Sequence, residues 1–424
     1  MTSNKRYSEA YIWAWLPGET EPVVAGRLAP ESDRLEFNYG QSYLERADAI
    51  PLYLPELPLR SGVLPLVPGL SMPGCIRDAA PDAWGRRIII NRRFGRTSAK
   101  IDVDQLDELT YLLESGSDRI GAIDFQQSAK VYTPREAPTA TLQELMTAAE
   151  LVEKGLPLTP ALEQVLFQGS SLGGARPKAM IVEGDRKYIA KFSLQSDITN
   201  VVKGEYVAMR LAAEIGLNVA PVRLVKVAKR DVLLIDRFDR ERKGDGWARR
   251  AMVSALTILG LDEMMARYGS YEDLAEIIRH RFAEPVEALH ELYGRLVFNI
   301  LCGNTDDHAR NHAAFWDGAT LTLTPGYDIC PQARTGQEAS QAMLIAGDNR
   351  MSRLSVCLQA ASAFLLGRDE AEAIIRAQTA AIYQHWDAVC DDAKVTKVDR
   401  NAMWRRQFLN PYAFIDAEFL GIAA

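Results

Sequence analysis

The first part of the chain alternates short apolar runs with turn residues. Residues 11–16 form one such run, which ends at Pro17-Gly18, and residues 23–28 and 35–39 form the next two. Runs of this length that are bounded by Gly, Pro, Asn or Asp predict β-strands. We therefore expect a β-rich segment over roughly the first 70 residues, where several prolines then mark extended chain.

Apolar residues then recur at helical spacing. This pattern predicts three helices, at residues 78–94, 104–116 and 141–154. Asp78 or Asp82 is a candidate N-terminal cap for the first of them. Thr141 and Glu144 have the spacing of a capping box at the start of the third. The next segment, residues 154–165, contains Gly and Pro and is interpreted as a connector.

A second pattern begins after this connector. We expect a small sheet with one helix, from strands at 179–182, 187–192, 222–227 and 232–235 and a helix at 203–215 that stops at Gly216. Beyond residue 250 the pattern is mainly helical, apart from a strand pair near 313–324. The order by itself predicts an α+β fold, and a two-lobed nucleotide-binding enzyme with an added N-terminal subdomain would have the same order. The expected divisions are a β-rich N-terminal subdomain, a nucleotide-binding sheet and a helical lobe, at 1–155, 156–240 and 241–424.

Composition narrows the class of protein without naming a function. The chain has 424 residues with 47% hydrophobic and 25% charged positions, which is typical of a globular protein. Its formal net charge of -7 disfavours nucleic acid as the principal ligand. The five widely spaced cysteines argue against a disulfide framework and a structural zinc site. We see no signal peptide and no apolar run of membrane-spanning length, and therefore expect a cytoplasmic protein without membrane contact.

The densest polar cluster is the segment 304–311, which follows an apolar helix. It holds Asp306 and, five positions later, Asn311, and a second apolar run ends at Tyr327-Asp328. Carboxylate and amide oxygens are the ligands that Mg²⁺ prefers, and a further carboxylate can accept a hydroxyl proton in phosphoryl transfer. The order Asp, Asn, distant Asp is that of protein kinases. The alternative is a helix N-terminus capped by Asn304 or Asp306.

Small residues and two lysines form a second candidate site. The segment 169–178 is rich in Gly and Ser and ends in Lys178, so its backbone could approach phosphate, although a plain glycine-rich hairpin has the same pattern. Lys191 lies in the expected strand 187–192, and Glu205 lies in the helix that follows. A strand lysine paired with a helix glutamate is how kinases hold a lysine on ATP phosphates. The segment 236–240 ends the last strand of this sheet, where a hinge would meet adenine.

Together these segments resemble the HipA family of toxin kinases. SSLGGARPKAMI, KYIAKFS, LLIDRFDR, NTDDHARN and LTPGYDI are similar to its phosphate loop, lysine strand, "RFDR" segment, catalytic loop and metal-binding strand end, and they occur in the family's order. The N-terminal LEFNYGQSYLE and IPLYLPELPLR also fit. The resemblance implies a protein-kinase-like fold with a HipA-like N-terminal subdomain. It also implies an ATP- and Mg²⁺-dependent serine/threonine kinase.

Roles follow from the resemblance position by position. Asp306 would be the catalytic base, and Asn311 and Asp328 would hold Mg²⁺. Glu205 would support the lysine, and Ser171, or its neighbour Ser170, would be autophosphorylated, which in the family displaces the loop and disables ATP binding. The residues expected to contact the nucleotide are Lys191, Lys178, Leu172, Gly173, Gly174, Ala175, Asp236, Phe238 and His308. Pro177 departs from the family pattern, because it has no backbone N–H to offer to phosphate.

The resemblance also implies partners. These are a HipB-like helix-turn-helix antitoxin, which would carry the contact with operator DNA, and a protein substrate such as an aminoacyl-tRNA synthetase. Two rival interpretations stay open. His308 and His312 have the spacing of zinc ligands on a helix, but a hydrolase would lack the glutamate of its usual motif. The other rival is an inactive kinase-like binding module in a repressor complex with the antitoxin.

Overall fold

The computed structural model describes residues 7–95, 102, 106–135, 140–171, 174, 176–193, 197, 200–334, 336 and 338–417. These fall into two compact units. The first takes Met1–Leu194, Lys226–Val253 and Phe315–Ala319, and the second takes Gln195–Val225, Ser254–Ala314 and Thr320–Ala424. The division into three domains stays a prediction. Within the described residues, no helix combines the length and apolar character that a membrane crossing requires.

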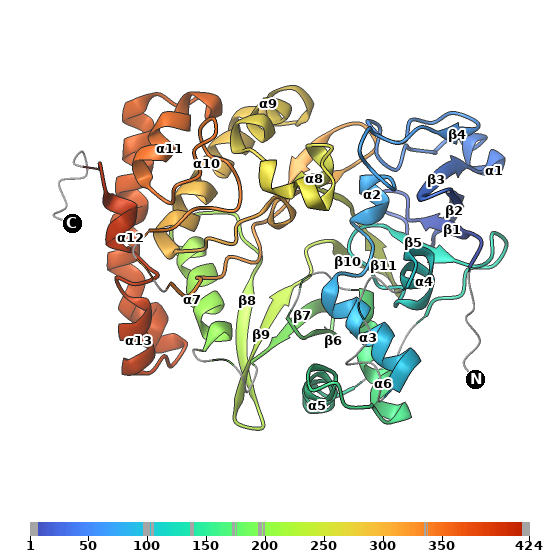
Figure 1. Cartoon of the computed structure of the whole chain (residues 1–424), viewed down its shortest axis with the longest axis horizontal. Helices are drawn as coiled ribbons and strands as arrows, with labels where there is room; N and C mark the ends of the chain where they lie inside the picture. Colours follow the sequence, from blue (N-terminus) through green and yellow to red (C-terminus); the bar gives the residue numbers. More distant parts are fainter. Residues whose placement is uncertain are drawn as a thin grey trace. The chain divides into compact units, whose positions relative to one another are not determined.

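The first unit begins with a five-stranded sheet in the order β4-β3-β2-β1-β5 (Figure 1). Its strands are β1 (Ala10–Ala14), β2 (Val23–Glu31), β3 (Arg34–Tyr39), β4 (Val63–Leu64) and β5 (Ile123–Gln126). The three strands expected at the start of the chain are confirmed. Their inward residues, such as Ile12, Leu28 and Phe37, are fully buried, which is the alternation that places one face of a sheet on a core.

The helices predicted at 78–94, 104–116 and 141–154 correspond to three of the six helices described in the first unit, and the other three were not predicted. They are α1 (Gln41–Leu44), α2 (Gly74–Arg77), α3 (Ala83–Phe94), α4 (Glu108–Glu114), α5 (Leu142–Glu153) and α6 (Pro160–Phe167). The capping box of Thr141 and Glu144 is confirmed. Asp82 occupies the N-cap position of α3, but its carboxylate makes no capping hydrogen bond. The connector prediction is wrong from Pro160 onward, because proline is well suited to the first position of a helix.

The second sheet has the strand order β6-β7-β9-β8. Its strands are β6 (Lys178–Glu183), β7 (Arg186–Phe192), β8 (Val222–Val227) and β9 (Arg230–Asp236), as the apolar runs predicted. A hairpin of β10 (Arg240–Lys243) and β11 (Gly246–Arg249) follows, and then β12 (Ala251–Ser254). These three strands were not predicted: β10 and β11 are rich in charged and small residues, and β12 is only four residues long.

The second unit is mainly helical, as expected. Its helices are α7 (Val201–Glu214), α8 (Ala255–Ile258), α9 (Tyr271–Arg281), α10 (Pro285–Cys302), α11 (Leu354–Ala360), α12 (Arg368–Asp392) and α13 (Lys397–Met403). The strand pair expected near 313–324 is present as β13 (Ala313–Trp316) and β14 (Leu321–Leu323). Helix α10 is the core of this unit, and its residues from Leu292 to Cys302 are all buried.

Candidate active site

The candidate catalytic loop starts where α10 ends. Gly303 is the C-terminal cap of α10 and has a φ of 75°, in the left-handed region that favours glycine. A Cβ atom at this position would lie 2.7 Å from the backbone oxygen of Gln407. The glycine therefore meets both a conformational and a steric requirement, and it turns the chain from the buried helix into residues 304–311.

Replacement of Gly303 by alanine is expected to lower the free energy of unfolding by roughly 1–2 kcal/mol or more, because it adds a close contact to left-handed strain. Gly216 is a matched control: its φ is 86°, and a Cβ there would meet nothing within 4 Å. Denaturant unfolding should show a larger loss for Gly303→Ala than for Gly216→Ala. Equal losses would contradict the steric part of this explanation.

Two neighbouring acids in the loop have opposite environments. Asp306 is exposed, whereas Asp307 is 1% exposed and is hydrogen-bonded to buried side chains. The amide Nδ2 of Asn311 donates to the backbone oxygen of Asp306 at 3.1 Å. The backbone N–H of His308 also donates to that oxygen, at 2.9 Å. The loop therefore folds back on itself so that Asn311 lies against the backbone of Asp306.

The segment carrying Asp328 meets the same loop. The Tyr327 hydroxyl donates to the backbone oxygen of Arg310 at 2.7 Å. Gly326, Tyr327 and Ile329 line one small hollow together with Asn311. Asp328 has a φ of 58°, which is uncommon for a residue other than glycine and typical of functional sites. The structure thus brings the Asp328 segment and Asn311 together.

Backbone contacts explain why this segment has a defined position. Gly326 exchanges backbone hydrogen bonds with the stretch before β8, where its N–H donates to Asn218 and its oxygen accepts from Ala220. The buried guanidinium of Arg295 on α10 donates to the backbone oxygens of Asn218 and Thr324, at 2.9 and 2.8 Å. A buried arginine that binds two loop carbonyls holds both loops at a fixed distance from the helix.

Two alternative interpretations were given for residues 304–312, a capped helix N-terminus and a pair of zinc ligands. Residues Ala309–Asn311 form a single 3-10 turn with His308 at its N-cap position, so His308 and His312 do not share a face of an α-helix. His312 Nε2 lies 2.9 Å from Asp307 Oδ1. The Asn304 amide donates to Asn299 Oδ1 at 3.0 Å. Across the part of the chain that the structure describes, no three His, Cys, Asp or Glu side chains gather as metal ligands.

Lys178 and Lys191 lie directly opposite each other in the first unit. The antiparallel register of β6 and β7 pairs these two residues, and both are buried. Side chains of directly paired residues share one face of a sheet. A Cβ atom on Gly174 would collide with the Lys178 ammonium, so the glycine-rich segment comes close to this lysine. The Gly174 N–H donates to Asp82 Oδ2 at 2.5 Å, a bond that the sequence did not predict.

Other predicted nucleotide contacts have the following positions. Asp236 ends β9 and pairs with Arg186 at 2.8 Å, and the ring of Phe238 packs edge-on against Phe315. Glu205 is buried on α7 in the second unit, and its pairing with Lys191 stays a prediction. Leu172, Gly173 and Ala175 lie outside the described residues.

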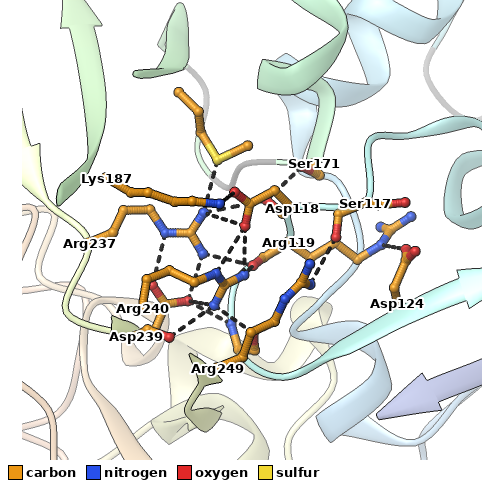
Figure 2. Close-up of polar contacts among 12 residues, drawn as sticks. Ser117, Asp118, Arg119, Asp124, Ser171, Lys187, Arg237, Asp239, Arg240 and Arg249 are labelled. Atoms are coloured by element: carbon orange, nitrogen blue, oxygen red, sulfur yellow. Dashed lines mark hydrogen bonds and ion pairs between the residues drawn. The ribbon is translucent and has the colours of Figure 1, made fainter. Parts of the chain in front are cut away.

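Figure 2 shows a polar network around the "RFDR" segment of the first unit. Asp239 accepts two hydrogen bonds from Arg237, at 2.8 and 2.7 Å, and one from Arg240 at 2.9 Å. Asp118 accepts from the same two arginines and from Lys187. Both arginine side chains are fully buried. Each buried charge therefore has a partner of opposite sign, which is the condition for tolerating it.

Charge pairing sets the ionisation of the two acids. Burial alone would raise the pKa of Asp239, but Arg237 and Arg240 outweigh it and lower the pKa to about 2. Burial likewise opposes ionisation of Asp118, yet Arg240, Arg237 and Lys187 hold its pKa well below the usual value. Both carboxylates are therefore charged at neutral pH.

The network also reaches the predicted phosphate loop. Ser171 lies in a 3-10 turn, Gln168–Ser171, and its hydroxyl donates to the backbone oxygen of Asp118 at 3.1 Å (Figure 2). The hydroxyl of Ser170 donates to Phe167 and accepts from the N–H of Gly116 at 3.0 Å. Both serines are buried. The start of the glycine-rich segment is thus fixed to residues 116–118.

Local sequence patterns did not predict the partners of the buried polar side chains. Asp118 and Arg119 occur in a short polar segment, SDRIG, whose two opposite charges between helix α4 and strand β5 are the only signal. Tyr271 and His312 each look like ordinary core residues, and neither pattern nor spacing links them to Asp307. The contacts of Tyr271 with Asp307 and of Arg240 with Asp118 join residues far apart in sequence, so they depend on the tertiary fold, which local periodicity does not report.

The described sheets and helices define an α+β fold. A model of the HipA-like C-terminal domain family matches residues 170–386, and a model of the HipA N-terminal domain family matches residues 20–126. The chain therefore belongs to the HipA family, as the sequence motifs indicated.

Relatives and a solved structure agree with this assignment. The Sinorhizobium fredii protein Y4mE is 28% identical over 253 residues, which cover 55% of this chain and 60% of the relative. The serine/threonine-protein kinase toxin HipA of Shewanella oneidensis is 26% identical over 46% of this chain and 51% of its own length. The matches thus span about half to three fifths of these relatives. A solved HipA structure, from a complex of S. oneidensis HipA, HipB and operator DNA, has a TM-score of 0.66 at 19% identity and covers 98% of this chain and 100% of that one.

Proposed function

We propose that this protein is a serine/threonine protein kinase that uses ATP and Mg²⁺. The observation that carries the proposal is the catalytic loop, where Asn311 binds the backbone of the exposed Asp306 and shares a hollow with the residues on either side of Asp328. Two carboxylates and an amide are suitable oxygen donors for Mg²⁺ and for proton transfer. Relatives named as kinases support the same class of activity.

Each of these residues has a distinct proposed role. Asp306 accepts the proton of the substrate hydroxyl, because it is the exposed acid of the loop. Asn311 and Asp328 hold Mg²⁺, which when bound neutralises charge on the phosphates. Lys178 and Lys191 bind phosphate oxygens, because both lie on one face of the sheet and Lys178 is close to the glycine-rich segment at Gly174.

The partners are proposed from the relatives. The S. oneidensis structure contains HipA, HipB and operator DNA. By analogy, this chain binds a HipB-like antitoxin, which makes the contact with operator DNA. Its substrate is proposed to be a protein, and an aminoacyl-tRNA synthetase is the first to test.

Labelling by ATP tests the proposal. The purified chain is incubated with γ-labelled ATP and Mg²⁺, alone and with a cell lysate, and a parallel sample contains EDTA. We expect label on the chain or on lysate proteins, and we expect it to disappear with EDTA and with Asp306→Ala. Wild-type protein that labels nothing above Asp306→Ala would favour the inactive binding module instead.

Autophosphorylation at Ser171 is a separate expectation. Both candidate serines are buried, so a phosphate can be added only if the turn 168–171 leaves its contacts with residues 116–118. Ser171→Ala is expected to prevent the loss of activity during incubation with ATP, whereas the matched Ser170→Ala is not. Mass spectrometry locates the phosphate, and phosphate on Ser170 would contradict this assignment.

A further inference from the structure

Three buried side chains meet behind the catalytic loop of the second unit. The Tyr271 hydroxyl donates to Asp307 Oδ2. His312 Nε2 lies 2.9 Å from Asp307 Oδ1 and 3.1 Å from the Tyr271 hydroxyl. The residues are 0%, 1% and 3% exposed for Tyr271, Asp307 and His312. We call these three residues the Tyr–Asp–His cluster.

The roles of donor and acceptor in the cluster follow from its chemistry. Burial first, and then the neighbouring Asp307, raise the pKa of Tyr271 well above its usual value, so the phenol stays protonated and donates. Asp307 accepts this bond on one oxygen and a second from His312 on the other. A buried carboxylate with a donor on each oxygen is fixed in orientation as well as in position.

The position of the cluster along the chain is its most informative feature. Asp307 directly follows Asp306, and His312 directly follows Asn311. The bond between Asp307 and His312 therefore closes the loop immediately beside the two residues proposed to act on substrate and metal. Between them, the Asn311 N–H donates to the His308 oxygen at 2.8 Å. The spacing of Asp306 and Asn311 thus depends on a buried bond between their neighbours.

Tyr271 ties this closed loop to the helical body. It is the first residue of α9, and its N–H donates to the backbone oxygen of Leu344 at 2.9 Å. Its ring is edge-on to the imidazole of His312, with centroids 5.4 Å apart. The backbone oxygen of His312 also accepts from Ala255 at the start of α8, at 2.8 Å. The loop is held by both helices.

We propose that the Tyr–Asp–His cluster positions Asp306 and Asn311 for phosphoryl transfer, with Tyr271 and His312 acting through Asp307 rather than on the substrate. The inference rests on the proposed kinase function. Its physical basis is that a shift of about 1 Å in a reacting group can lower a rate roughly a hundredfold. Removal of one member should therefore change turnover more than the affinity for nucleotide.

Two tyrosine variants provide a matched test. Tyr271 and Tyr293 are both fully buried and both pack against Phe364. The Tyr293 hydroxyl makes no hydrogen bond to the part of the chain that the structure describes. Tyr271→Phe is expected to lower kcat at least tenfold, with a change in the KM for ATP of less than about threefold. Tyr293→Phe is expected to retain wild-type kcat. Both are assayed well below their melting temperatures.

Two variants of His312 distinguish a role in positioning the catalytic loop from a role in stabilising the fold. His312→Gln places an amide N–H near the position of Nε2, so its kcat should stay within about threefold of the wild-type value. His312→Leu has no such donor, and its kcat should be at least about tenfold lower than wild type. A purely structural role would lower the melting temperature of both His312 variants and leave kcat of the folded fraction unchanged. This pair decides the question if Tyr271→Phe does not fold.

These experiments test the proposed kinase function and the positioning role of the Tyr–Asp–His cluster separately. Wild-type protein without ATP-dependent phosphate transfer overturns the proposed function, and this inference with it. Active wild type overturns the inference alone if Tyr271→Phe turns over like Tyr293→Phe, or if His312→Leu is as active as His312→Gln. A selective loss of kcat in Tyr271→Phe and His312→Leu supports it.

Discussion

Replacement of Asp306 by asparagine is expected to lower kcat for phosphoryl transfer by roughly a thousandfold, while the fold stays intact. Asparagine has the size of aspartate but cannot accept the proton of the attacking hydroxyl, and general-base catalysis contributes about 10²- to 10⁴-fold. Asp306 is exposed, so its replacement leaves no buried group without a partner. Single-turnover labelling and thermal unfolding measure the two effects.

Asp348 provides the control for this variant. It is also an exposed aspartate of the second unit, at a turn distant in sequence from the loop. Asp348→Asn should keep wild-type kcat and stability. If Asp306→Asn retained more than about a tenth of the activity, the assignment of Asp306 as the base would be wrong.

Replacement of Asp239 by alanine is expected to cause the largest loss of stability, roughly 3–5 kcal/mol. The change removes the carboxylate that binds Arg237 and Arg240 and leaves both guanidinium groups buried with fewer partners. The measurement is denaturant unfolding at neutral pH. Asp245, exposed between β10 and β11, is the matched control, and Asp245→Ala should change stability by less than about 0.5 kcal/mol. Similar losses in both variants would contradict the role of the network.

The lowered pKa of Asp239 predicts that the stability of the fold depends on pH. Asp239 has its pKa lowered from 3.8 to about 2 by the two arginines, which outweigh burial. A carboxyl group whose pKa falls on folding stabilises the native state above its unfolded pKa, and this stabilisation is lost as the pH decreases towards 2. Wild-type protein should therefore lose stability in acid more steeply than Asp239→Asn does. Parallel acid curves would rule out this contribution.

Local patterns predicted the elements better than their contacts. The strands at β6 to β9 were predicted because each is a short apolar run beside turn residues, and α5 because Thr141 and Glu144 mark its start. The β10–β11 hairpin was missed because RERKGDGWARR contains almost no apolar residues. Its strands pair with each other, so hydrogen bonding rather than burial defines them.

In the candidate site too, local sequence patterns predicted individual residues better than the contacts between them. Asp306, Asn311 and Asp328 were predicted because their order is that of protein kinases, and their roles stay predictions. Asp78 or Asp82 was predicted to cap a helix from its place before it, but the Asp82 carboxylate makes no capping bond and accepts from the N–H of Gly174. Tyr271 and Arg295 carry no local signal, and Asp118 has only the opposite charge of its neighbour, since each binds partners that only the folded chain brings near.

The contrast between Asp306 and Asp307 has a practical consequence for mutagenesis. One acid faces solvent and the next binds the buried Tyr271 and His312, so substitutions at these two positions should abolish the proposed kinase activity by different routes. A genetic screen that scores only loss of the proposed kinase activity will group them together. Melting curves will separate them, because only the change at position 307 removes a partner from groups enclosed in the protein interior.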